Sequence, residues 1–122
     1  MAALLAPSPT IIHSEYYPMN ILLQEGMIRP VDWESAAIAA GEIDLASLTE
    51  NWPTNIVQEC ELDYQRARWP AGPPADFERT LGAAQFYLSF RWLGDRPAWT
   101  THESNLWRFE RLRSVGERLQ LI

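Results

Sequence analysis

Five polar side chains that could bind a metal ion or move a proton lie near the start of the chain. His13, Glu15 and Asn20 fall within IIHSEYYPMNILL, between two aliphatic runs, and Asp32 and Glu34 follow an aliphatic residue in VDWE. Amide and carboxylate oxygens are hard ligands that suit Mg²⁺, an ion that keeps several waters and is shared with substrate phosphates. A carboxylate placed beside such an ion could accept a proton from a hydroxyl group. These residue types therefore favour phosphoryl transfer, in which catalysis rests on positioning and charge neutralisation.

The same residues also have purely structural readings. A single histidine after two isoleucines, such as His13, is commonly a structural residue that forms hydrogen bonds, and the carboxylates together could be only a solvated acidic surface. A one-metal hydrolase is a third reading, which is disfavoured because the second histidine, His102, is far along the chain. The spacing alone does not separate these interpretations.

The cluster needs strands to bring its two halves together. Residues 10–12 and 20–23 read as short strands on either side of a polar loop, and 27–31 reads as a returning strand after a turn at Gly26. Pro30 cannot donate a ladder hydrogen bond, so this strand is expected to be short or at an edge. If the strands pair, the polar loop converges with Asp32. The segment 33–42 is expected to be a loop.

A helical body is expected to follow. A helix begins near Asp44, whose carboxylate suits the positive end of the helix dipole, and three longer helices cover about 54–69, 76–93 and 103–119, the first capped by Thr54. The pattern WPAGPP breaks the chain after the first of these, and GDRPAW ends the second. The fold class is therefore α+β, mainly α. The expected core stripes are Val57, Cys60, Tyr64 and Ala67; Phe77, Leu81, Ala84, Leu88 and Trp92; and Leu106, Phe109, Leu112 and Leu119.

Composition limits the function classes. The 122 residues fit one small domain, and 47% of them are hydrophobic, enough for a core. The formal charge is −6, and residues 1–63 hold ten carboxylates against Arg29 alone, which argues against nucleic acid and suits a divalent cation or a cationic substrate. The single cysteine, Cys60, permits no internal disulfide, and no apolar run approaches a membrane span or a signal peptide. We expect a soluble, cytoplasmic protein that binds neither nucleic acid nor membrane.

The segment from Ile11 to Trp52 resembles a known family. IIHSEYYPMNILL, GMIRPVDWE and IDLASL are similar to the catalytic loop (His-Gly-Asp-x-x-x-x-Asn), the metal-binding segment (Ile-Asp-Trp/Phe-Glu) and the Asp-Leu-Ala helix start of the aminoglycoside phosphotransferase and choline kinase-like family. That family is a branch of the protein-kinase-like fold. The resemblance implies the C-terminal lobe of such a kinase, with a short β-hairpin carrying both segments and three main helices after it.

The resemblance also implies roles for individual residues. Glu15 takes the position of the catalytic base, Asn20 and Asp32 bind the Mg²⁺ that accompanies ATP, and Glu34 supports the metal. His13 braces the loop, and Asp44 holds it by hydrogen bonds without touching substrate. The implied activity is ATP-dependent phosphoryl transfer to the hydroxyl group of a small molecule, which the acidic first half suggests is cationic.

Two kinds of departure from the family bear on activity. Glu15 stands where the family has aspartate, and Ser14 replaces a glycine, which is costly if the position needs a positive φ. About ten residues precede the loop, no two glycines are spaced as Gly-x-Gly, and the chain has no lysine to hold nucleotide phosphates. Residues 1–122 are therefore expected to form a single partial domain that lacks the nucleotide-clamping lobe and is inactive by itself. The alternative is a non-catalytic remnant that binds a metal or a partner.

Such a domain is expected to leave an apolar face uncovered. Leu4, Leu5, Tyr16 and Tyr17 should be exposed, and unpaired strand edges should make the chain prone to associate.

Overall fold

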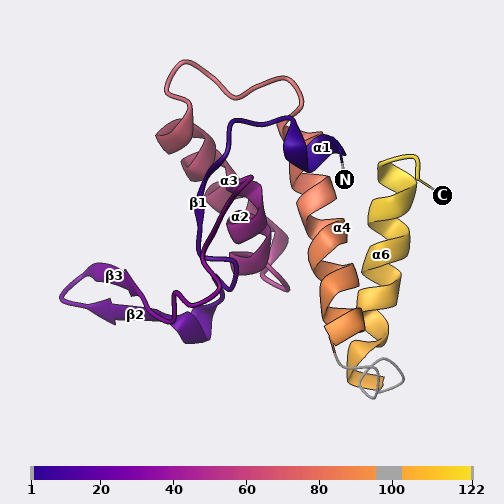
Figure 1. The fold of residues 1–122 in the computed structure, drawn as a ribbon, viewed down its shortest axis with the longest axis horizontal. Helices are drawn as coiled ribbons and strands as arrows, with labels where there is room; N and C mark the ends of the chain where they lie inside the picture. The colour runs from indigo at the N-terminus through magenta and orange to yellow at the C-terminus, as the bar shows by residue number, and fades with distance from the viewer. Residues whose placement is uncertain (1, 96–102, 122) are drawn as a thin grey trace.

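The computed structural model describes residues 2–95 and 103–121, which form an α+β fold that is mainly helical (Figure 1). This fold class was predicted. The elements in chain order are α1 (Ala2–Leu5), β1 (Thr10–Ile12), the 3₁₀ turn η1 (Pro18–Asn20), β2 (Ile21–Gln24), β3 (Met27–Pro30), β4 (Ala37–Ala39), α2 (Glu42–Leu48), α3 (Thr54–Arg68), α4 (Phe77–Asp95), the 3₁₀ turn η2 (Glu103–Asn105) and α6 (Leu106–Arg118).

Strands β2 and β3 form the expected hairpin. They pair antiparallel, with Gln24 opposite Met27, so that Glu25 and Gly26 make a two-residue turn. Both turn residues have positive φ, 52° and 76°, which is the conformation that matches the twist of a two-residue hairpin. Among the described strands, β3 pairs with β2 alone, so it is an edge strand. Pro30, which has no N–H to donate, is tolerated at such an edge.

The second sheet corrects one prediction. Residues 33–42 were expected to be a loop, but β4 lies within them and pairs antiparallel with β1, with Ile11 opposite Ile38. The three residues of β4 are too few to show alternation, and their partner lies far back in the sequence, so no local pattern marked them as a strand. The pairing places the end of β4, Ala39, opposite the start of β1, Thr10, and α2 begins at Glu42, shortly after β4.

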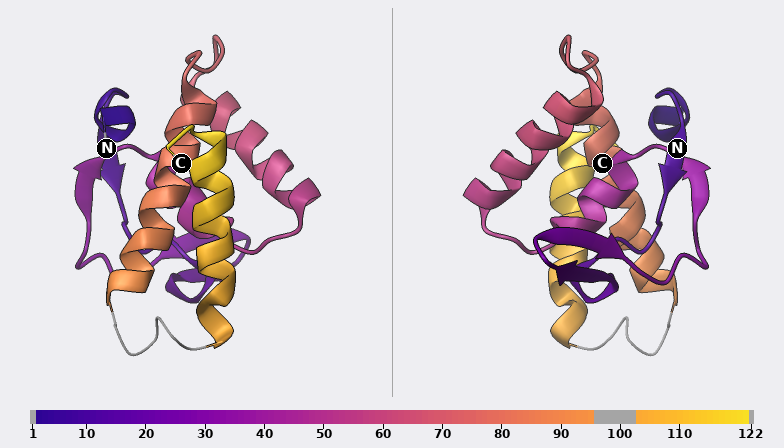
Figure 2. Two further views of the ribbon diagram at one scale, coloured as in Figure 1. Left: turned by 90° about the vertical axis from the view of Figure 1, so that its right-hand side faces the viewer. Right: turned by 90° about the vertical axis from the view of Figure 1, so that its left-hand side faces the viewer.

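Helix α4 is the centre of the body and packs between α2 and α6 (Figure 2). Its predicted stripe is confirmed, except that Trp92 is only half-buried. The core joins this stripe to the end of β1 and to α2 because those elements carry buried apolar residues on facing sides. The buried cluster consists of Ile12, Ile43, Leu45, Ala46, Phe77, Leu81, Ala84 and Leu88.

Two other helices differ in detail from the prediction. Thr54 does not cap α3, because Pro53 occupies the capping position and no side chain makes a cap hydrogen bond there. On α3, Ala67 is exposed, and Cys60 and Tyr64 are half-buried against the core.

On α6, the predicted inward residues Leu106 and Phe109 are exposed, whereas Val115 and Gly116 are buried. Leu106 and Phe109 are not inward because Arg108 lies on the inward side of the first turns of α6, where it forms an ion pair with Glu50.

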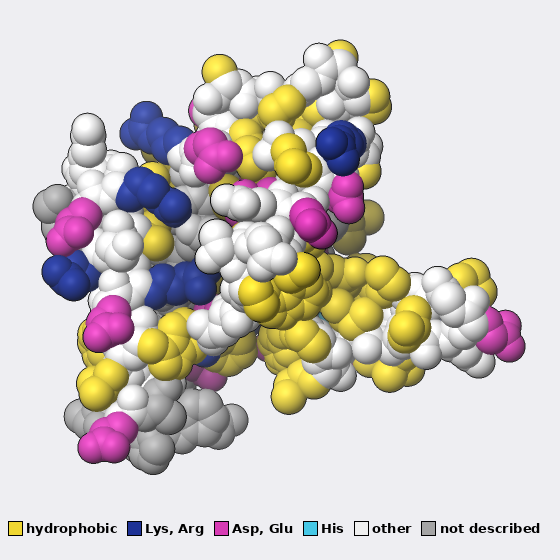
Figure 3. Space-filling view, turned by 180° about the vertical axis from the view of Figure 1, so that it is seen from behind, with side chains coloured by type: hydrophobic (Ala, Val, Ile, Leu, Met, Phe, Trp, Pro, Cys, Tyr) yellow, Lys and Arg dark blue, Asp and Glu magenta, His cyan; other side chains and the backbone are white. Residues whose placement is uncertain are grey.

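The exposed apolar surface lies elsewhere than predicted. Leu5 is exposed, but Leu4, Tyr16 and Tyr17 are half-buried. The β2–β3 hairpin carries the large apolar patch instead and projects from the body (Figure 3). Its exposed residues are Leu22, Leu23, Met27 and Ile28. Among the described residues, no helix has both the length and the apolar character that crossing a membrane requires.

Candidate active site

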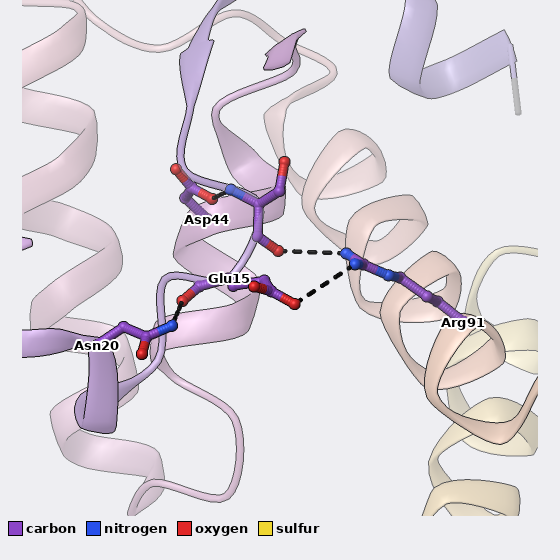
Figure 4. A network of polar contacts seen from close by, with 5 residues as sticks. Glu15, Asn20, Asp44 and Arg91 are labelled. Atoms are coloured by element: carbon purple, nitrogen blue, oxygen red, sulfur yellow. Dashed lines mark hydrogen bonds and ion pairs between the residues drawn. The ribbon is translucent and has the colours of Figure 1, made fainter. Parts of the chain in front are cut away.

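Asp44 anchors the polar loop, which we define as residues 13–20. From the first turn of α2, its carboxylate accepts the backbone N–H of His13 at 2.6 Å and that of Ser14 at 2.9 Å (Figure 4). Burial raises the pKa of Asp44, and the two N–H donors oppose that shift. Both carboxylate oxygens face the loop backbone, so the hydrogen-bonding contact expected of Asp44 is present.

Ser14 has the backbone conformation that made its replacement of glycine a concern. Its φ is 71°, in the left-handed region. An L-residue there costs about 1–2 kcal/mol relative to a right-handed conformation. The hydrogen bond from its N–H to the half-buried carboxylate of Asp44 opposes that cost, because hydrogen bonds to charged groups are stronger than neutral ones.

His13 braces the loop against the segment that leads to Asp32. The side chain is buried, and its Nε2 donates to the backbone oxygen of Val31 at 2.7 Å, which makes Nε2 the protonated nitrogen. Its ring also lies 4.7 Å from the ring of Trp33, measured between centroids. Among the described residues its Nδ1 has no hydrogen-bond partner. This is a positioning contact, since the ring is closed off from solvent.

Asn20 ties the two halves of the cluster together. Its Nδ2 donates to the backbone oxygen of Glu15 at 3.1 Å, and its own backbone oxygen accepts the N–H of Val31 at 2.9 Å. The side-chain oxygen of Asn20 points away from Glu15 (Figure 4).

The pKa of Tyr17 is affected by all three of the predicted site residues Glu15, Asn20 and Asp32. Burial raises its pKa most, the charges of Glu15 and Asp32 raise it further, and Asn20 and Arg91 lower it. Glu15, Asn20 and Asp32 therefore all lie within electrostatic or hydrogen-bonding reach of one phenol. Asp32 has a positive φ of 66° and an exposed side chain.

Glu34 is the predicted site residue that the structure does not bring into this group. Its side chain is exposed, and none of the described contacts joins it to the loop. Its metal-supporting role stays a prediction.

The described residues do not include a cluster of side chains that could hold a metal ion by themselves. No group of three or more histidine, cysteine, aspartate or glutamate side chains in the described ranges is arranged to hold a metal ion. Asn20 and Asp32 instead offer one amide oxygen and one carboxylate. Two oxygen ligands are a set that Mg²⁺ accepts, because it completes its shell with waters and phosphate oxygens.

One residue of the site was missed by the sequence reasoning. Arg91 on α4 donates from Nη1 to the backbone oxygen of Ser14 at 3.3 Å, and its Nη2 lies 3.8 Å from Oε1 of Glu15. Ser14 lies 77 residues before Arg91 in the sequence, and Glu15 is the next residue. The predicted stripe of α4 indicated only that Arg91 neighbours an inward residue, Trp92.

Comparisons with protein-family models, with curated proteins and with solved structures found no match for this chain. The residues and contacts described above are therefore what a functional proposal can draw on.

Proposed function

We propose that this chain is the C-terminal lobe of an ATP-dependent small-molecule phosphotransferase with a protein-kinase-like fold, similar to aminoglycoside phosphotransferases and choline kinases. One observation carries the proposal. A single set of hydrogen bonds joins the polar loop to Asp44, to Val31 beside Asp32, and back to Glu15 through Asn20. A base and two magnesium ligands need this kind of fixed mutual placement, because phosphoryl transfer depends on positioning.

Glu15 is the proposed general base. Its carboxylate is partly open to solvent, with 20% of the side chain exposed, and it lies too far from Arg91 for a hydrogen bond. The oxygens are therefore free to accept the proton of an acceptor hydroxyl group. The bond from Asn20 to the backbone oxygen of Glu15 fixes the backbone that carries the base.

Asn20 and Asp32 are the proposed magnesium ligands. When bound, Mg²⁺ would neutralise the negative charge on the phosphates of the nucleotide. The chain contributes the oxygens and their placement: the amide of Asn20 is oriented by Glu15, and the residue before Asp32 is held by His13 and Asn20.

The nucleotide phosphates need a further partner. The 122 residues contain no lysine and no Gly-x-Gly loop. We propose that residues outside this sequence hold the phosphates, and that the 122-residue chain alone does not transfer them.

A non-catalytic binding domain is the second candidate. The exposed apolar hairpin favours it, because Leu23 and Ile28 are 76% and 62% exposed, more than solubility alone favours. A partner that covers the hairpin would account for these residues without any chemistry at Glu15.

The proposal is tested by following phosphoryl transfer from ATP to a panel of alcohols, with the protein as its gene encodes it. Asp32→Asn should abolish transfer, because the metal loses its charged ligand. Glu15→Gln should lower kcat and leave nucleotide binding intact. Glu25→Gln, at the hairpin turn, is the control and should change neither. Transfer at the normal rate in Asp32→Asn would contradict the metal assignment.

A further inference from the structure

Cationic side chains gather on the side of the molecule formed by α4 and α6 (Figure 3). The chain as a whole carries a formal charge of −6, so this concentration is local. Like charges that are brought together need anions near them. The arginines of these two helices are Arg79, Arg91, Arg108, Arg111, Arg113 and Arg118.

Two arginines of α6, Arg108 and Arg111, interact with the carboxylate of Glu50. Arg108 forms a two-pronged bond with the carboxylate of Glu50, at 3.0 Å and 3.5 Å, and lies over the ring of Trp107. Burial lowers the pKa of Arg111, the charge of Glu50 raises it, and the charge of Arg108 lowers it. The charge of Glu50 thus acts on two cations, Arg108 and Arg111.

Arg91 has N–H donors that no described residue accepts. A guanidinium carries five N–H groups, yet among the described residues Arg91 makes one hydrogen bond, to the backbone oxygen of Ser14 at 3.3 Å. Its separation from Glu15, 3.8 Å, is beyond hydrogen-bond length, and 32% of its side chain is exposed. The guanidinium therefore stands beside the proposed base, with its two terminal nitrogens directed at the backbone oxygen of Ser14 and at Oε1 of Glu15 (Figure 4).

Aromatic rings flank this guanidinium. Arg91 lies over the ring of Trp92, 5.6 Å from its centroid, and the ring of Tyr17 lies 6.2 Å from Trp92. The fork of donors on a guanidinium suits the planar oxygens of a carboxylate or the oxygens of a phosphate.

We infer that Arg91 determines acceptor specificity, and that the acceptor is an alcohol that also carries an oxyanion, a carboxylate or a phosphate group. The inference rests on the proposed function, in which Glu15 takes the proton of the acceptor hydroxyl. A short hydroxy acid or alcohol phosphate has its hydroxyl and its anion only a few atoms apart. It could therefore meet Glu15 with one group and Arg91 with the other. A cationic acceptor, which the charge of residues 1–63 suggested, would be repelled at this position.

Four small alcohols of matched size test the inference without ATP or metal: glycerate, glycerol 3-phosphate, glycerol and choline. Each is titrated at constant ionic strength, in the presence of EDTA, while the side-chain NMR signals of Arg91 and Trp92 are followed. Glycerate, glycerol 3-phosphate or both should shift these signals, and the pair distinguishes carboxylate from phosphate. Glycerol and choline should not shift them.

Variants identify the residue responsible. Arg91→Gln should weaken binding of the anionic alcohol at least about tenfold, the equivalent of about 1.4 kcal/mol. Arg91→Lys keeps the charge but loses the fork, so it should weaken binding less; it also decides the question if Arg91→Gln does not fold. Arg113→Gln is the matched control, because Arg113 is an exposed α6 arginine paired with Glu117.

Several outcomes would overturn the inference: no binding of either anionic alcohol, choline binding at Arg91, or unchanged affinity in Arg91→Gln or, where only that variant folds, in Arg91→Lys. Failure of the proposed function looks different. Anion binding at Arg91 without magnesium-dependent phosphoryl transfer would overturn the enzyme assignment alone, whereas transfer to choline without anion binding would overturn the acceptor class alone.

Discussion

The polar loop and the β2–β3 hairpin are adjacent in the chain but are held in opposite ways. The loop is bonded to Asp44 on α2, to Val31 and to Arg91 on α4. The hairpin is defined by its turn and its own ladder, and it leaves Leu23, 76% exposed, and Ile28, 62% exposed, to solvent. Side-chain bonds from distant elements thus fix the loop, whereas local backbone pairing shapes the hairpin.

This difference predicts where stability is concentrated. A change at a loop anchor should remove bonds that nothing else replaces, because the freed backbone groups are partly buried. A change on the hairpin should leave the fold intact and alter only what the surface binds. Substitutions in each region can therefore break or sharpen the comparison.

The largest effect is expected at Asp44. Asp44→Ala should lower the free energy of unfolding by about 3 kcal/mol, because hydrogen bonds to a charged group contribute about 1.5–3 kcal/mol each and two N–H groups lose their acceptor. Urea denaturation measures the change. Asp63→Ala is the control: Asp63 is 79% exposed and, among the described residues, forms an ion pair with Arg66 alone, so its loss should cost less than about 0.5 kcal/mol. Equal losses in the two variants would show that the loop is not anchored at Asp44.

A second effect should appear in the pH dependence of stability. Burial raises the pKa of Asp44 above its ordinary value of 3.8, so the folded state retains a proton that the unfolded state has released. Stability from this group is therefore full below pH 3.8 and is lost as pH rises through the folded pKa. Asp44→Asn does not titrate and should lack that fall. Parallel stability curves for the two proteins above pH 3.8 would contradict the direction of the shift.

Ser14 offers a smaller test of the loop. Ser14→Gly should stabilise the fold by about 0.5 kcal/mol, because relief of about 1–2 kcal/mol of left-handed strain outweighs the greater freedom of glycine in the unfolded chain. Ser14→Ala keeps the strain and serves as the control. Thermal unfolding of the three proteins would measure the order, and a Ser14→Gly protein less stable than Ser14→Ala would show that the positive φ carries no strain.

The smallest change in stability is expected on the hairpin. Leu23→Glu should alter the free energy of unfolding by less than about 0.5 kcal/mol, since Leu23 is already exposed. It should nevertheless reduce self-association, measured by sedimentation velocity, because it places a charge on the apolar patch. Leu5→Glu, at an equally exposed position on α1, is the matched control. If both variants reduce association alike, the hairpin is not the associating surface.

The sequence predicted the hairpin and α4 well because their signals are local. Glu25 and Gly26 mark a turn between apolar runs, and Phe77 to Leu88 recur at helical spacing. By contrast, the pairing of β1 with β4 and the approach of Arg91 to Ser14 join residues far apart in sequence. No local pattern encodes such contacts, so they came only from the structure.

The candidate site divides in the same way. Glu15, Asn20 and Asp32 were singled out by residue type and by the resemblance to the kinase-like family, and their chemical roles stay predictions. The first half of the inward stripe of α6, Leu106 and Phe109, was predicted wrongly because periodicity cannot show that the ion pair of Arg108 with Glu50 places a charged residue inward.

The most direct test of the proposed site is to locate a bound divalent cation on this chain by NMR. Mn²⁺, a paramagnetic substitute for Mg²⁺, should broaden the Asn20 side-chain amide and the Asp32 backbone signal first. Excess Mg²⁺ should restore both signals, and Asp32→Asn should remove the effect. Broadening centred on other carboxylates, such as those of Glu59, Glu61 and Asp63, or broadening that persists at Asn20 in Asp32→Asn, would contradict a magnesium site at the polar loop.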